Sequence, residues 1–155
     1  MHRTDNALVS SNLIANVSAG GISAGNYFNS FSESPIGSSL TLTNNTIHHA
    51  GLGHITAFGG GWGSGGGGIG IEGSYRLAPN ATSLHTNITM AYNTITPLAN
   101  QPAISAQSVT GLRIGPGNLW CTWSAGGRNV VEHCADVTDD GNQCCDDACE
   151  RCRPC

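Results

Sequence analysis

A segment of eight residues recurs along this chain, and it constrains the fold more than any other feature. The copies are ALVSSNLI at 7–14, LTLTNNTI at 40–47 and ITMAYNTI at 88–95, and LRIGPGNLW at 112–120 is a looser fourth copy. The first three copies have apolar residues at their first, third and last positions and an asparagine at the sixth. Alternation over so short a run is typical of a β-strand with one buried face.

The copies are separated by a second apolar pair and by no helical periodicity. From Ile88 to Leu112 is 24 residues, which we interpret as one bare coil, and the longer spacings of 33 and 48 residues as the same coil with insertions. A short-strand unit that recurs in this way predicts a parallel β-solenoid, because each coil buries its apolar face only against its neighbours. The second pairs are Ile22 with Ala24, Ile69 with Ile71, and Ile104 with Ala106.

The asparagines of the repeat are predicted to be structural. Stacked coils would place them in one column at a turn, where asparagine tolerates left-handed backbone angles. An inward amide must find hydrogen-bond partners, and stacked amides bond one another along a ladder. The predicted ladder consists of Asn12, Asn45, Asn93 and Asn118.

This repeat resembles the right-handed parallel β-helix family, the fold group of pectate lyases and many carbohydrate-active proteins. The resemblance covers about residues 5–120. It implies an all-β, right-handed, single-stranded parallel β-helix of about three to four coils, and the rule for parallel crossovers favours the same hand. No polar cap precedes Ala7, so we expect a C-terminal fragment whose partners include the remaining coils of a longer parent chain.

All seven cysteines lie in the last 35 residues, which places a predicted boundary near Trp120. We expect β-helix coils over 1–120, with a glycine-rich insertion at 50–68, and a cysteine-rich tail over 121–155 that caps or anchors the helix. Dense cysteines favour disulfides, and the alternatives are a zinc site or a disordered end. An odd count leaves one cysteine free, paired between chains or paired elsewhere. The disulfide candidates are Cys121, Cys134, Cys144, Cys145, Cys149, Cys152 and Cys155.

Composition excludes several classes of partner. Only 10% of residues are charged, the net charge is −4, and Lys and Arg number six, which argues against nucleic-acid binding and a polybasic membrane surface. No apolar run approaches the length of a membrane span. The N-terminus shows no signal peptide. Candidate glycosylation sequons and the family resemblance nevertheless favour a secreted or cell-surface protein, with polysaccharide as the partner.

The segment NTIHHAGLGHITAFGG resembles a motif of glycoside-hydrolase-like β-helix proteins, but Ala57 occupies its acidic position. Imidazole titrates near neutrality and suits a general base, and Arg113 should point outward from a strand toward an acidic ligand. The catalytic candidates are His48, His49, Glu72 and Arg113, and the substrate-binding candidates are Trp62, His54 and Arg76. No cofactor or metal site is predicted.

Two functions follow as hypotheses. The resemblance implies a glycoside hydrolase or polysaccharide lyase that acts on an extracellular polysaccharide. The alternative is a non-catalytic β-helix that serves as a polysaccharide-binding, adhesive or surface-structural module. The alanine at position 57 favours the alternative, because glycoside hydrolysis normally uses two carboxylates.

Overall fold

The computed structural model describes residues 5–17, 20–25, 38–50, 68–72, 85–97, 102–122, 129–146 and 151–154. Within these ranges every regular element is a β-strand, and the strands belong to three sheets. The described residues contain no helix long and apolar enough to cross a membrane.

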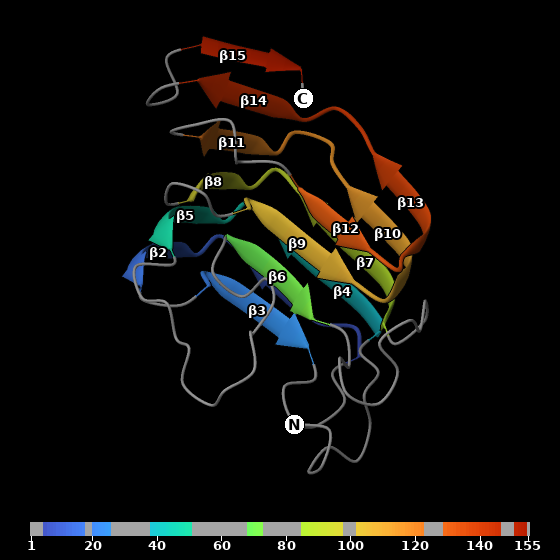
Figure 1. Cartoon of the computed structure of the whole chain (residues 1–155). Coiled ribbons are helices and arrows are strands. Elements are labelled where there is room, and N and C mark those ends of the chain that lie inside the picture. Colours follow the sequence, from blue (N-terminus) through green and yellow to red (C-terminus); the bar gives the residue numbers. More distant parts are fainter. Residues whose placement is uncertain are drawn as a thin grey trace, which may run out of the picture.

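Each sheet takes one strand from each successive coil (Figure 1). Sheet A contains β1 (Leu8–Ser10), β4 (Ser38–Thr43), β7 (His85–Ala91), β10 (Val109–Ile114) and β13 (Ala135–Asp139). Sheet B contains β2 (Leu13–Val17), β5 (Thr46–Ala50), β8 (Thr94–Pro97), β11 (Leu119–Thr122), β14 (Gln143–Asp146) and β15 (Arg151–Pro154). Sheet C contains β3 (Ile22–Gly25), β6 (Ile69–Glu72), β9 (Ile104–Gln107) and β12 (Val130–Glu132).

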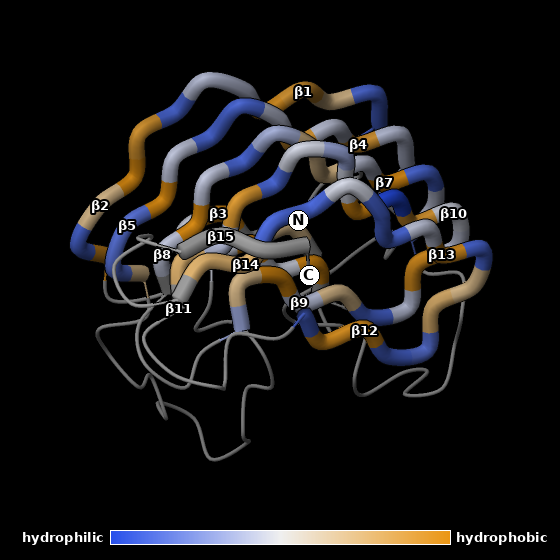
Figure 2. Tube along the Cα trace, turned by 90° about the horizontal axis from the view of Figure 1, so that it is seen from above, coloured by the Kyte–Doolittle hydropathy of each residue, from blue (hydrophilic) through white to orange (hydrophobic). Residues whose placement is uncertain are grey.

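The chain passes from sheet A to sheet B to sheet C and then begins the next coil. The pairing is parallel throughout, except that β15 pairs antiparallel with β14. This is a parallel β-helix of about four coils, as the repeat predicts. The view from above shows the sheets as the sides of the coil (Figure 2).

The core consists of inward columns that the strand register aligns. Leu40, Ile88 and Leu112 stack in one column, and Met90 stacks with Ile114 in the next. All five side chains are buried, with 7% or less of their surface exposed. Each buried apolar side chain contributes about 1.5–3 kcal/mol, so the repeat of apolar residues stabilises the stack coil by coil.

The parallel stack continues beyond residue 120, where the sequence analysis placed its boundary. Strand β12 pairs with β9, β13 with β10, and β14 with β11, all in parallel. The first part of the cysteine-rich segment therefore forms further strands of the same three sheets. Of the cysteines in it, Cys121, Cys144 and Cys145 are disulfide-bonded, whereas Cys134 has a free thiol.

Candidate functional site

The corner between sheets A and B carries an asparagine ladder along the stack. The backbone N–H and the Nδ2 of Asn45 both donate to Oδ1 of Asn93, at 3.1 and 3.0 Å. Asn93 donates in the same way to Oδ1 of Asn118, at 3.0 Å for both bonds. Asn12 repeats the pattern toward Asn45. The four predicted amides therefore form the ladder, and each Oδ1 that accepts does so from the coil before it.

The second N–H of each inner amide is satisfied by a strand carbonyl. Nδ2 of Asn93 donates to the carbonyl oxygen of Leu42 at 2.9 Å, and Nδ2 of Asn118 to that of Met90 at 2.8 Å. Asn93 and Asn118 have no exposed surface. A buried amide with all its groups paired stabilises one arrangement of the coils, so these residues are structural.

Asn142 is a fifth rung that the sequence analysis missed. Its Oδ1 accepts from Nδ2 of Asn118 at 2.9 Å, and its Nδ2 donates to the carbonyl oxygen of Ile114 at 3.1 Å. Asn142 follows Gly141 as Asn118 follows Gly117, so a signal was present in the Gly-Asn pair. The apolar pattern around it is weak, because only Val137 and Ala135 mark its strand.

The left-handed residue at this corner is the one before each ladder asparagine. The repeat predicted left-handed backbone angles for the asparagine itself, and that prediction is wrong. The turn needs the positive φ one residue earlier, which leaves the asparagine in the orientation that points its amide inward. The residues with positive φ are Ser11 (58°), Asn44 (54°), Tyr92 (56°), Gly117 (75°) and Gly141 (63°).

The two candidate histidines lie together on β5, at the outer surface of sheet B. His48 follows buried Ile47 and is half-buried, and its Nδ1 lies 3.3 Å from Oγ1 of Thr96. His49 is exposed at a left-handed position with φ of 52°, and its Nδ1 lies 3.3 Å from Oδ1 of Asn16. In the part of the chain that the structure describes, neither imidazole contacts a carboxylate. The usual partner that orients a catalytic histidine is therefore not supplied by the described residues.

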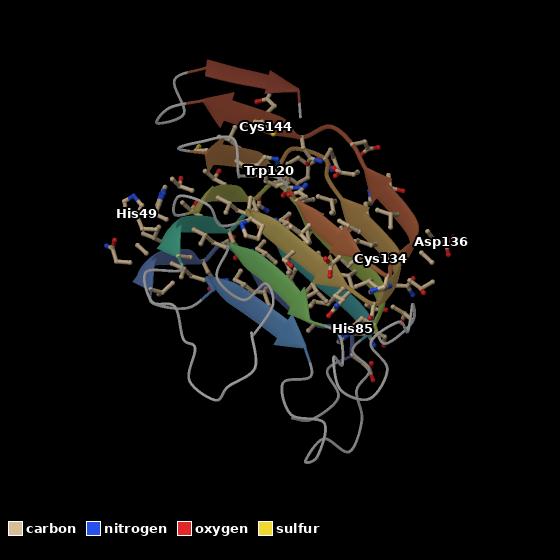
Figure 3. The ribbon with its side chains drawn as sticks, viewed as in Figure 1. His49, His85, Trp120, Cys134, Asp136 and Cys144 are labelled. Atoms are coloured by element: carbon tan, nitrogen blue, oxygen red, sulfur yellow. The ribbon has the colours of Figure 1, made fainter. Side chains whose placement is uncertain are left out.

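The four catalytic candidates are distributed over three sheets rather than brought together. His48 and His49 belong to sheet B, Glu72 ends β6 in sheet C, and Arg113 lies on β10 in sheet A. The side chain of Arg113 is exposed between buried Leu112 and Ile114, as predicted. The strand positions thus place these residues on different sides of the coil, and the stick view shows His49 far from the side of the molecule with Cys134 and Asp136 (Figure 3).

The substrate-binding candidates Trp62, His54 and Arg76 lie outside the described residues. So do Cys149, Cys155 and residues 51–67 of the glycine-rich insertion. Cys152 is described only through the backbone of β15. Within the described ranges no three His, Cys, Asp or Glu side chains are grouped as a metal would require.

The outer surface of sheet A carries two columns of hydroxyl side chains, which we call the hydroxyl face. Thr41 pairs with Thr89, and Arg113 pairs with both Thr89 and Thr138. Thr41 and Thr89 alternate with buried core residues, and all the side chains of this face are half-buried or exposed. The face consists of Ser38, Thr41, Thr86, Thr89, Thr110 and Thr138.

Sequence reasoning also missed a buried histidine at the opposite corner. His85 begins β7 with 4% of its surface exposed, and it pairs with Val109 in the next coil. Ala135 pairs with Thr110, so Cys134, the residue before Ala135, lies next to Val109 in the column that begins with His85. Thiol Sγ of Cys134 donates to the carbonyl oxygen of Glu132 at 3.3 Å, and burial raises the pKa of this thiol above its ordinary value.

No family model, curated protein or solved structure matches this chain. Function must therefore be argued from the residues themselves.

Proposed function

We propose that this protein is a non-catalytic β-helix that binds an extracellular polysaccharide on the outer surface of its stacked sheets. The hydroxyl face is the observation that carries the proposal. It supplies donors and acceptors in register, repeated at the spacing of adjacent strands, about 4.8 Å. An extended polysaccharide repeats its own hydroxyls along its length, so the two surfaces are chemically alike.

Three hydroxyls of this face are available to a ligand. In the described part of the chain, the side chains of Thr41, Thr89 and Thr138 make no hydrogen bond to protein, whereas Ser38 bonds Asp5. A hydroxyl that is solvated in the free protein exchanges water for a sugar hydroxyl with a small net gain, about 0.5–1.5 kcal/mol for each bond. Affinity would thus depend on several such bonds formed together.

The charge of the face supports an uncharged ligand. Arg113, which lies in register with Thr89 and Thr138, carries an exposed positive charge. The exposed carboxylate of Asp136 lies on the same sheet, and that of Asp5 lies at the edge of the sheet. The whole chain has a net charge of −4. A uronate polymer, which is negatively charged, would not be attracted to this combination of charges. The binding of a neutral polysaccharide does not depend on the charge of the face.

The cysteines support an extracellular location. Disulfides persist in oxidising compartments, and Cys121, Cys144 and Cys145 are disulfide-bonded. The protein would then be secreted or displayed on the cell surface. The repeat also supports placing it within the right-handed β-helix group that includes pectate lyases, where polysaccharides are the common ligands.

The catalytic alternative lacks support in the described residues. Hydrolysis needs a pair of carboxylates at one site, and the candidates His48, Glu72 and Arg113 lie on three different sheets. We therefore propose binding and treat cleavage as an outcome that the test must be able to detect.

The test is affinity electrophoresis of the full chain through gels that contain hydroxyethylcellulose, galactomannan, xyloglucan, polygalacturonate or alginate. The same samples are assayed for reducing ends and for absorbance at 235 nm. Retardation without product is the expected result. Reducing ends would replace the proposal with hydrolysis, absorbance would replace it with elimination, and migration unchanged in every gel would refute it.

A further inference from the structure

Tyr92 departs from the rule that governs its column. The column before the ladder needs a positive φ, and three of its other four members, Asn44, Gly117 and Gly141, are residue types that accept one at low cost. Tyrosine at φ of 56° is strained, by about 1–2 kcal/mol for a residue with a bulky Cβ substituent. The preceding coil uses Asn44 at the equivalent position, so the fold does not require an aromatic residue there.

The ring of Tyr92 contacts the next coil and yet is exposed. A Cβ atom on Gly117 would lie 2.5 Å from Cδ1 of Tyr92, so the ring lies against the glycine backbone of the next coil. The backbone N–H of Tyr92 donates to the carbonyl oxygen of Pro116 at 3.0 Å. Even so, 56% of the residue surface remains exposed. An exposed aromatic ring contributes little to the core, so strain at this position indicates a role outside folding.

Two threonine hydroxyls lie near Tyr92 along the backbone. Thr43 pairs with Ala91, the residue before Tyr92, and Thr94 follows Tyr92 by two positions. Both are half-buried, and in the described ranges neither hydroxyl bonds to protein. Thr43 also ends the strand that contributes Thr41 to the hydroxyl face. The corner thus combines an exposed aromatic ring with hydroxyl groups on neighbouring backbone positions.

We propose that Tyr92 is the stacking platform of a sugar-binding subsite, with Thr43 and Thr94 as its polar contacts. The ligand is a neutral polysaccharide that presents the apolar C–H face of a pyranose to the ring. An aromatic surface with hydroxyls at its rim matches such a sugar, whose ring face is apolar and whose edge is polar. This proposal rests on the proposed function and gives it a location and a ligand class.

The experiment measures two properties of each variant of the full chain: retardation in the neutral-polysaccharide gels and the midpoint of urea unfolding. Tyr92→Asn removes the ring and restores a residue suited to the left-handed backbone, and Tyr92→Phe keeps the ring. His133→Asn is the matched control, because His133 is an exposed aromatic residue at φ of 52° on another corner.

We expect Tyr92→Asn to weaken binding by about tenfold or more while the unfolding midpoint is unchanged or raised. Tyr92→Phe and His133→Asn should bind as the native chain does. Undiminished binding by Tyr92→Asn would refute the subsite and leave the proposed function standing. A large fall in the midpoint would show that the ring serves folding and would equally refute it.

Two further outcomes distinguish a failure of the subsite proposal from a failure of the proposed function on which it rests. Retardation of the native chain by polygalacturonate or alginate alone would overturn the neutral ligand class. Retardation in no gel would refute the proposed function itself, and the subsite with it.

Discussion

Two adjacent columns at the corner between sheets A and B repeat five times each, and yet one is uniform in its residues and the other is varied. The ladder column is asparagine in every coil, from Asn12 to Asn142. The column one residue earlier reads Ser, Asn, Tyr, Gly, Gly. Both are fixed by the same turn, so the difference shows which physical requirement each position meets.

The ladder column is uniform because its side chain is specified atom by atom. Oδ1 must accept two N–H groups from one coil while Nδ2 donates to a carbonyl and to the next amide, and only asparagine has that geometry. The left-handed column is constrained only in φ, which several residues satisfy. A column under weak constraint is free to carry function, and Tyr92 is the residue there that φ alone does not explain.

The largest effect on the free energy of unfolding is expected when an inner asparagine of the ladder is removed. Asn93→Ala removes two acceptor contacts from Asn45 and two donor contacts to Leu42 and Asn118, all buried. We expect a loss of roughly 3–5 kcal/mol in the free energy of unfolding, because several buried groups are left unpaired. Urea denaturation followed by circular dichroism measures it.

Asn12→Ala is the matched control for that substitution. Asn12 is exposed at the first coil, and its Nδ2 bonds Ser10 in its own coil as well as Asn45. We expect a loss of about 1 kcal/mol or less. Equal losses at Asn12 and Asn93 would contradict a ladder whose strength comes from burial.

A second prediction concerns the contribution of disulfides to the stability of the last coil, which contains Asn142. Cys121 and Cys145 are buried neighbours on β11 and β14, and both are disulfide-bonded. We expect reduction by dithiothreitol to lower the free energy of unfolding by about 2–4 kcal/mol. An unchanged urea midpoint after complete reduction, checked by mass spectrometry, would show that the stack needs no disulfide.

A third prediction concerns two neighbours in the left-handed column, Tyr92 and Gly117. Gly117→Ala places a Cβ 2.5 Å from the Tyr92 ring at φ of 75°, and we expect a loss of about 1–2 kcal/mol. Gly70→Ala is the control, since a Cβ there meets nothing within 4 Å and φ is not positive. Part of the loss should disappear in the Tyr92→Asn background, and a strictly additive double-mutant cycle would argue that the ring does not rest on Gly117.

The smallest predicted effect concerns the pH dependence of Cys134. Because burial raises its thiol pKa in the folded state, its contribution to stability is complete below the pKa of the unfolded thiol and is lost as pH rises through the folded pKa. Native protein should react with iodoacetamide more slowly at pH 8 than urea-unfolded protein does. Equal rates in the two states, with peptide mapping to Cys134, would contradict the raised pKa.

The repeat allowed the coils, the inward columns and four ladder asparagines to be predicted, because apolar period and register follow from burial alone. Asn142 was not predicted because its coil is rich in cysteines and acidic residues, so that it has fewer of the apolar residues that mark the earlier copies. The outer surface could not be predicted in the same way. The repeat assigns Arg113 and Glu72 to different strands of a coil, but it does not show which outer side chains of His48, Glu72 and Arg113 share a side of the stack, since that depends on the sheet to which each strand belongs.

The most direct test of the comparison is the same substitution at neighbouring positions: Asn93→Gly and Tyr92→Gly, each measured by urea unfolding of the full chain. We expect a loss of roughly 3–5 kcal/mol in the free energy of unfolding for Asn93→Gly and a change within about 1 kcal/mol for Tyr92→Gly, since glycine removes the left-handed strain there. Comparable losses at both positions would contradict the claim that the ladder residue serves the fold and the residue before it does not.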